Sequence, residues 1–301
     1  MQHVRPTWFE EFVGQESIKK VLDTAIQSAK QSTHTLWHIL FSGPSWYGKT
    51  TLSTIVASTM EVPFKVVTGY ALSKPAEMIS LLNGLESGAV LFIDEIHRLR
   101  PNVEEVLYIA MEDYSIDMVM PDWTSVRLPL EPFTLIAATT KPETLSQPLK
   151  NRFLYSFHLE PYTYDDKVRI IKRYLDTQSI EASYTMIEHI EQYVSYTPRE
   201  IASLAVQLRD YIIVHGAWSS VLSESIREGV QALYQRSEWG LSTLQQRYLE
   251  VLERAYPDPV WSKTLAATLN ISQKAIEDDV EPLLFQNGRI TKSSRGRALV
   301  R

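Results

Sequence analysis

Residues 43–51 read Gly-Pro-Ser-Trp-Tyr-Gly-Lys-Thr-Thr, which is a glycine, four further residues, and then Gly-Lys-Thr. Glycines permit left-handed backbone, so successive N–H groups can point at phosphate oxygens. In this pattern Lys49 reaches the β- and γ-phosphates and the Thr50 hydroxyl ligates Mg²⁺. An apolar run at 36–41 precedes the loop and a helical pattern at 51–58 follows it, as the motif requires. The loop residues expected to contact nucleotide are Gly43, Tyr47, Gly48, Lys49, Thr50 and Thr51.

Composition sets broad limits on the chain. Its 301 residues are enough for two or three domains, and it contains no cysteine. Disulfides and thiolate metal sites are therefore excluded, which is consistent with a reducing compartment. No apolar run reaches about 18 residues and the N-terminus lacks a signal-peptide pattern, so we expect a cytoplasmic protein without a membrane span. The net charge of −6 restricts any DNA contact to a local basic patch.

Two further apolar runs end in polar side chains. Residues 88–93 lead into Asp94 and Glu95. Asp94 can hold Mg²⁺ and Glu95 can orient an attacking water, the alternative being an acidic loop after a buried strand. Residues 133–140 end in two threonines, and parallel sheets present such strand ends to the ligand. We therefore expect Thr139 or Thr140 to sense the γ-phosphate.

Three other features have both a functional and a structural interpretation. Arg152 can complete a neighbouring subunit's nucleotide site in trans, or be a surface arginine in an ion pair. The turn with Phe12 and Val13 can line an adenine pocket, or simply lead into a helix packed on the core. Residues 115–130 predict a β-hairpin whose methionines and Trp123 can dock a partner, or fold onto their own core.

The C-terminal part predicts a winged helix. A helix-turn-helix pattern at 260–285 is followed by the turn Asn287-Gly288 and a basic stretch. The second helix carries four acids, which would repel phosphates, so we do not expect it to read a major groove. The basic stretch can grip phosphates without reading bases, the alternative being a solvated basic tail. The acids are Glu277, Asp278, Asp279 and Glu281, and the expected DNA contacts are Arg289, Lys292, Arg295 and Arg297.

Taken together, these stretches resemble the RuvB family, the AAA+ motors of Holliday-junction branch migration in bacteria. The resemblance runs from about Arg5 to the end of the chain. It rests most on residues 5–6, 11–15, 91–99, 111–114, 132–136, 138–140, 197–199 and 295–297. It implies an α/β fold with a parallel sheet in three domains. These are an AAA+ P-loop ATPase domain at 1–160, a small helical lid domain at 161–236 and a winged-helix DNA-binding domain at 237–301.

The resemblance also implies site roles and the cofactors ATP and Mg²⁺. Thr50 and Asp94 would hold the metal, Glu95 the water, Arg152 would act as a trans finger, and Arg199 as a second sensor. The further nucleotide contacts that it implies are Arg5, Phe12, Val13, Tyr162, Pro198 and Arg199. The implied partners are duplex DNA at four-way junctions and a RuvA-like protein on the hairpin at 115–130. The implied assembly is a homo-hexamer, or a monomer without DNA, in the bacterial cytoplasm at the nucleoid.

Three rival functions stay open at this point. A clamp-loader-like AAA+ ATPase would lack the basic wing and usually carries Ser-Arg-Cys where this chain has Asn151-Arg152-Phe153. A non-hydrolysing ATP-binding scaffold in a DNA-repair assembly is favoured by Trp46, which stands where the family has glycine, and opposed by the retained Asp94 and Glu95. A sequence-specific binder of the initiator type is disfavoured by the acidic second helix.

Overall fold

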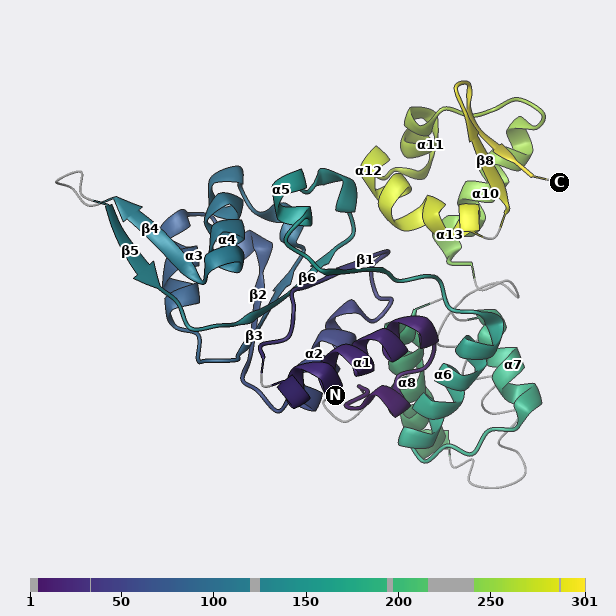
Figure 1. The fold of residues 1–301 in the computed structure, drawn as a ribbon. Helices are drawn as coiled ribbons and strands as arrows, with labels where there is room; N and C mark the ends of the chain where they lie inside the picture. The colour runs from purple at the N-terminus through teal and green to yellow at the C-terminus, as the bar shows by residue number, and fades with distance from the viewer. Residues whose placement is uncertain are drawn as a thin grey trace. The chain divides into compact units, whose positions relative to one another are not determined.

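Figure 1 shows the computed structural model of the chain, which divides into two compact units, Met1–Asp166 and Lys167–Arg301. The structure describes residues 5–32, 34–119, 125–193, 197–215, 241–286 and 288–300. The predicted boundary between the lid and the winged helix, at 236–237, lies outside the described residues.

The first unit is organised around a five-stranded sheet in the order β2-β3-β6-β1-β7, and every pairing is parallel. The three central strands are buried apolar runs, as a sheet covered on both faces requires. Parallel strands place their carboxyl ends at one edge, so the polar residues that end β1, β3 and β6 share that edge. The strands are β1 (Ile39–Ser42), β2 (Phe64–Thr68), β3 (Val90–Asp94), β6 (Thr134–Thr139) and β7 (Tyr155–His158).

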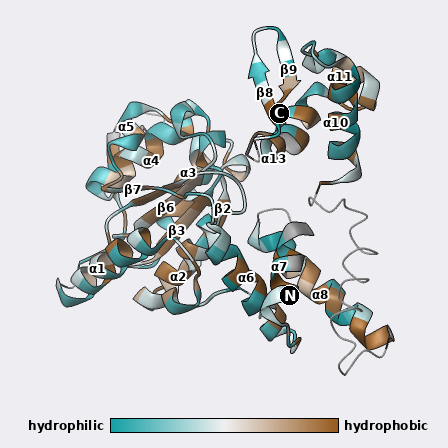
Figure 2. Cartoon of the chain, turned by 90° about the vertical axis from the view of Figure 1, so that its right-hand side faces the viewer, coloured by the Kyte–Doolittle hydropathy of each residue, from teal (hydrophilic) through white to brown (hydrophobic). Residues whose placement is uncertain are grey.

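Helices cover both faces of this sheet. Figure 2 shows the hydrophobic strands between α1 and α2 on one side and α3 and α4 on the other. Short 3₁₀ turns occur at Phe9–Glu11, Gly69–Ala71, Ile96–Arg98 and Pro142–Thr144. The helices are α1 (Glu16–Ser32), α2 (Lys49–Met60), α3 (Pro75–Asn83), α4 (Pro101–Asp113) and α5 (Gln147–Lys150). The core against α3 and α4 includes Met78, Leu91, Ile93, Leu107 and Leu135.

The predicted β-hairpin is present. β4 (Ser115–Val119) and β5 (Ser125–Pro129) pair antiparallel, with Ile116 opposite Leu128. Ile116 is buried in the core while Val126 is about half exposed. The tip with Met120 and Trp123 lies outside the described residues, so its docking role stays a prediction.

The second unit begins with helices that have capped or proline-started N-termini. Helix α6 (Tyr164–Thr177) leads into it, and the Thr163 hydroxyl both donates to Asp166 at 2.8 Å and accepts its N–H at 3.2 Å. The Asp166 carboxylate in turn accepts the Thr163 backbone N–H at 3.3 Å, which completes a reciprocal cap. Helices α7 (Tyr184–Tyr193) and α8 (Pro198–His215) follow, and α8 begins at a proline, which needs no N–H partner.

The predicted winged helix is also present. Its helices pack around a separate core that includes Leu252, Leu265 and Ile276. The second helix of the pair is interrupted by a π-helical turn at Ile276–Val280, whereas the sequence predicted one continuous helix. The elements are α10 (Thr243–Ala255), α11 (Ser262–Leu269), α12 (Gln273–Ala275), α13 (Glu281–Gln286), β8 (Ile290–Ser293) and β9 (Gly296–Leu299).

A buried histidine joins three elements of the first unit. His38, just before β1, accepts the backbone N–H of Leu135 at Nδ1 (2.9 Å), and its Nε2 lies 3.2 Å from the carbonyl oxygen of Met111. Nε2 therefore carries the single proton of a neutral ring. Burial lowers the pKa of His38 from 6.5 to about 4, so the folded state resists protonation.

His38 predicts a pH dependence of stability. Between pH 6.5 and about 4 the unfolded chain binds a proton at His38 that the folded chain does not, so the free energy of unfolding falls as the pH falls. The full effect is about 3 kcal/mol. Urea unfolding at several pH values measures it, with His38→Gln as the comparison, since Gln does not titrate. The variant should be less stable at pH 7 but lose less stability on acidification; equal losses would contradict the assignment.

Candidate active site

The loop predicted to bind phosphate lies between the end of β1 and the start of α2. Gly43 has φ +130° and Gly48 has φ +96°, a region that favours glycine. A Cβ at Gly43 would lie 2.7 Å from the Leu159 carbonyl oxygen, and one at Gly48 would lie 2.6 Å from the Phe12 ring. Close approach and backbone conformation therefore both require glycine at these two positions.

Trp46 adopts a backbone conformation that favours glycine, the residue that the resemblance implies at this position. Its φ is +73°, a left-handed conformation that costs a residue with a side chain roughly 1–2 kcal/mol. The indole is 54% exposed, so it lies outside the loop and does not fill it. Strained residues of this kind persist where the surrounding structure holds them, often at functional sites.

Lys49 begins α2 and lies inside the loop. Its side chain is buried, and Nζ donates to the carbonyl oxygens of Gly43 (2.8 Å) and Pro44 (2.7 Å). Burial lowers the pKa of Lys49, and the carboxylates of Glu95 and Asp94 oppose that shift. The structure thus brings the predicted phosphate-binding lysine near Asp94, the predicted metal ligand, and Glu95, the predicted water-orienting residue.

Asp94 and Glu95 follow one another at the end of β3. The Glu95 N–H donates to Asp94 Oδ1 at 3.0 Å, and burial raises the pKa of the Asp94 carboxyl. A cation would offset that cost of burial, and Thr50, half-buried in the first turn of α2, offers a second oxygen. The oxygens fit the Mg²⁺ expected at this loop, and the glycine-lined loop fits a phosphate.

The two threonines after β6 have different surroundings. The buried Thr139 Oγ1 accepts the backbone N–H of Lys141 at 3.0 Å and lies 3.0 Å from His97 Nδ1. Thr140 donates to Glu95 Oε2 at 3.4 Å. Thr139 thus makes internal contacts and Thr140 contacts the predicted water-orienting acid, and both stay predicted γ-phosphate sensors. Sequence reasoning missed His97, which lies two residues after Glu95.

Aromatic rings gather beside the loop. Tyr47 and Tyr162 stack with centroids 5.8 Å apart at 20°, and the Tyr162 hydroxyl donates to the Tyr47 carbonyl at 3.2 Å. Phe12 is buried against Gly48, while Val13 is half-buried. These are walls suited to a planar base.

The remaining predicted nucleotide contacts lie elsewhere in the chain. Thr51 is half-buried in α2 and Arg5 is exposed, while Pro198 and Arg199 begin α8 in the second unit.

Two family models match this chain. The Holliday junction DNA helicase RuvB P-loop domain matches residues 4–159, and the RuvB C-terminal winged helix domain matches residues 238–301. The chain belongs to the RuvB family. It is 39% identical to the Holliday junction branch migration complex subunit RuvB of Fervidobacterium nodosum, over 98% of this chain and 85% of that protein.

Solved RuvB structures have the same fold. The Thermotoga maritima RuvB Holliday junction branch migration motor is 34% identical, with a TM-score of 0.84, over all of this chain and 96% of that one. The RuvB of Campylobacter concisus is 38% identical over 98% of this chain and 88% of that protein. The predicted family and fold class are confirmed. No described helix is long and apolar enough to cross a membrane.

The arginine predicted to act in trans in this RuvB-family chain makes an ion pair within its own subunit. Arg152 follows α5 (Gln147–Lys150), and its Nη2 contacts Oε2 of Glu112 on α4. The Arg152 side chain is 31% exposed, while its buried Nε has no partner among the described residues. The ion pair that was the structural alternative is thus present, and the role in trans stays a prediction.

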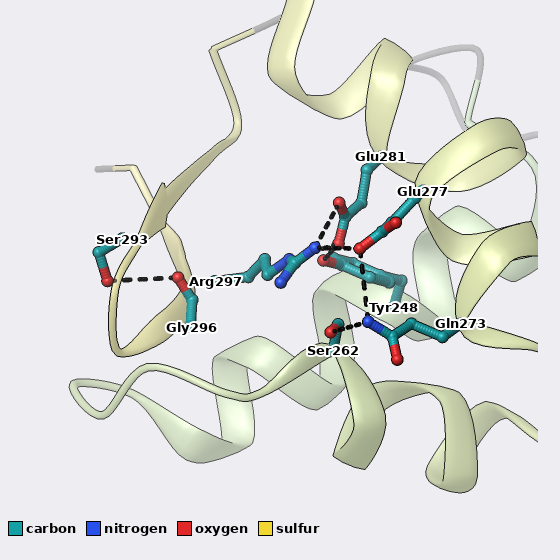
Figure 3. A network of polar contacts seen from close by, with 8 residues as sticks. All are labelled: Tyr248, Ser262, Gln273, Glu277, Glu281, Ser293, Gly296 and Arg297. Atoms are coloured by element: carbon teal, nitrogen blue, oxygen red, sulfur yellow. Dashed lines mark hydrogen bonds and ion pairs between the residues drawn. The ribbon is translucent and has the colours of Figure 1, made fainter.

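In this RuvB-family chain, one of the four basic residues predicted to contact DNA is buried in the winged-helix domain. Arg297 on β9 is 5% exposed and points into the domain (Figure 3). Its guanidinium donates to Glu281 Oε1 at 2.7 Å and Glu277 Oε1 at 3.0 Å, and Tyr248 donates to Glu281 Oε1 at 2.8 Å. Arg297 was predicted to contact DNA because the sequence shows which residues of the wing are basic but not which way each side chain points. Lys292 and Arg295 are exposed and Arg289 is half-buried, so these three stay predicted contacts.

This difference between neighbouring arginines is testable. Arg297→Leu leaves the Glu281 carboxylate buried without its cation, which is expected to cost about 3–5 kcal/mol of stability. Arg295→Leu removes an exposed charge, so stability should change by less than about 0.5 kcal/mol while binding of any duplex weakens. Thermal unfolding and duplex binding at several salt concentrations measure both effects. Equal stability of the two variants would contradict the buried ion pair.

Proposed function

We propose that this chain is an ATP-driven motor that moves duplex DNA at four-way junctions, and so drives branch migration in recombination and repair. The observation that carries this is the joint placement of Lys49, Asp94 and Glu95 at one edge of the parallel sheet in a RuvB-family chain. Lys49 binds the phosphates, Thr50 and Asp94 hold Mg²⁺, and Mg²⁺ supplies charge neutralisation at the β- and γ-phosphates.

The other predicted residues complete the reaction cycle. Glu95 orients the attacking water, and Arg152 stabilises charge at a neighbour's γ-phosphate. Thr140 and Arg199 report the state of the nucleotide, and motion of the lid carries that report to the DNA. The predicted walls of the adenine site are Phe12, Val13, Tyr162 and Pro198, and Tyr47 of the loop is a further predicted nucleotide contact. This division of roles requires each site to lie between two copies, which supports a homo-hexamer on DNA.

The proposed partners follow from the basic residues of the wing and from the β-hairpin. Lys292 and Arg295 of the exposed wing, with Arg289, grip the phosphates of the duplex. The hairpin of β4 and β5 docks a RuvA-like protein. Such a motor works where bacterial chromosomal DNA is, in the cytoplasm at the nucleoid.

A junction assay tests the proposal. A synthetic four-way junction with one labelled arm is incubated with the chain, ATP, Mg²⁺ and a RuvA protein. Conversion to duplex products should require ATP and fail with Glu95→Gln. Conversion that is independent of ATP, or no conversion although ATP and junction are both bound, would contradict the motor and favour a scaffold.

A further inference from the structure

One ring nitrogen of His97 lies between two groups at the edge of the active site. His97 is in the turn Ile96–Arg98 that follows β3, and its side chain is 7% exposed. Its Nδ1 is 3.2 Å from Oε2 of Glu95 and 3.0 Å from Oγ1 of Thr139. The proposed mechanism above gives His97 no role, although it contacts the residue that orients water.

The acceptors indicate which tautomer of His97 fits. The Glu95 carboxylate can only accept a hydrogen bond, so an unprotonated Nδ1 would face it with a lone pair at 3.2 Å. Thr139 Oγ1 already accepts the N–H of Lys141, and its hydroxyl can accept again. A proton on Nδ1 therefore makes the hydrogen bond to Thr139 Oγ1 and also lies beside the carboxylate of Glu95, which attracts the N–H dipole and disfavours a lone pair there.

The two oxygens of Glu95 are not equivalent. Oε2 contacts His97 and also accepts the Thr140 hydroxyl at 3.4 Å. Oε1 has no hydrogen bond to any residue that the structure describes. The Glu95 backbone is left-handed (φ +51°, ψ +47°), which is an unusual conformation for a residue with a side chain. One oxygen is therefore anchored to the protein while the other remains for a ligand.

We propose that His97 is a positioning residue for ATP hydrolysis: its Nδ1–H holds Oε2 of Glu95 so that Oε1 accepts from the attacking water. This inference rests on the proposed role of Glu95. In this role His97 acts through Glu95, so its loss should affect the rate of the chemical step and leave the binding of ATP unchanged.

A matched pair of variants tests this role. Asn and Leu both branch at Cγ, but only the Asn amide nitrogen takes the place of Nδ1 and donates. His97→Leu should lower kcat about tenfold to hundredfold with KM for ATP unchanged, as expected when a polar contact with a charged group is lost. His97→Asn should stay within about threefold of the natural chain. Steady-state hydrolysis with junction DNA measures both parameters.

The outcomes separate positioning from packing. Equal loss of kcat in both variants would mean that His97 acts through its shape, and no loss of kcat in either would mean that Glu95 does not need it; each result overturns the proposal.

The Glu95→Gln variant is measured alongside as a control for the proposed role of Glu95. If it abolishes turnover while His97→Leu does not, only the inference about His97 fails; if it retains turnover, the proposed role of Glu95 fails as well. If His97→Leu is less stable to heat, His97→Gln replaces it, since its amide reaches the Nε2 position.

Discussion

Replacing Glu95 with Gln is expected to leave ATP binding intact and to lower turnover by roughly 10²–10⁴-fold. The substituted amide keeps the shape of the side chain, and its oxygen can still accept from Thr140. It lacks the negative charge that polarises the attacking water. Equilibrium binding of ATP and steady-state hydrolysis, both with junction DNA, separate these two effects.

Glu143 offers a matched control for this substitution. It lies in the turn Pro142–Thr144, is exposed, and is near enough to influence the pKa of His97. Glu143→Gln therefore removes the same charge close to the site without removing the predicted water contact. Its turnover should stay within about twofold of the natural chain. Equal losses of turnover in the two variants would mean that any negative charge near the site has this effect, and would contradict the assignment of Glu95 as the water-orienting residue.

Replacing Arg152 with Ala is expected to lower turnover of the DNA-bound assembly by about 10³-fold or more. An arginine that reaches a neighbour's γ-phosphate stabilises charge that develops only in the transition state. In this structure Arg152 pairs with Glu112 at a partly exposed position, so the guanidinium has to exchange that carboxylate for the phosphate. Arg152→Lys keeps the charge but loses the planar fork, and should recover little of the rate.

Mixing two inactive variants distinguishes a role in trans from one in cis. Arg152→Ala chains retain Glu95, and Glu95→Gln chains retain the arginine. If Arg152 serves a neighbour, some sites in a mixed assembly contain both residues and hydrolysis reappears. If Arg152 serves its own subunit or only the ion pair with Glu112, mixing leaves turnover as low as in either variant alone.

The central features of the fold and site could be predicted because they are local in sequence. The Gly-Lys-Thr pattern and the apolar run before Asp94 specify a strand, a loop and a helix within short windows. Thr139 and Thr140 could not be separated, since neighbouring residues at a strand end point in opposite directions and a shift of one residue reverses them. The structure distinguishes their contacts, since Thr139 lies beside His97 and Thr140 beside Glu95, and the sensor role of either stays a prediction.

The orientation of Arg297 depends on pairing that sequence order does not reveal. Glu277 and Glu281 are four residues apart, hence on one helix face, and that face meets β9. The acidic helix and the basic wing were therefore interpreted separately, although two of the acids neutralise one of the arginines. The sequence offered one signal for this pairing: Glu281 lies among apolar residues such as Val280 and Leu284, which the structure buries together with it.

The rate of ATP hydrolysis with and without four-way junction DNA tests the central claim most directly. The natural chain, Glu95→Gln and Trp46→Gly are measured at saturating ATP and Mg²⁺, alone, with junction, and with junction and a RuvA protein. The motor predicts hydrolysis that rises with junction DNA and rises further with RuvA in the natural chain, despite the left-handed conformation of Trp46. Bound ATP that no condition causes the natural chain to hydrolyse would contradict it.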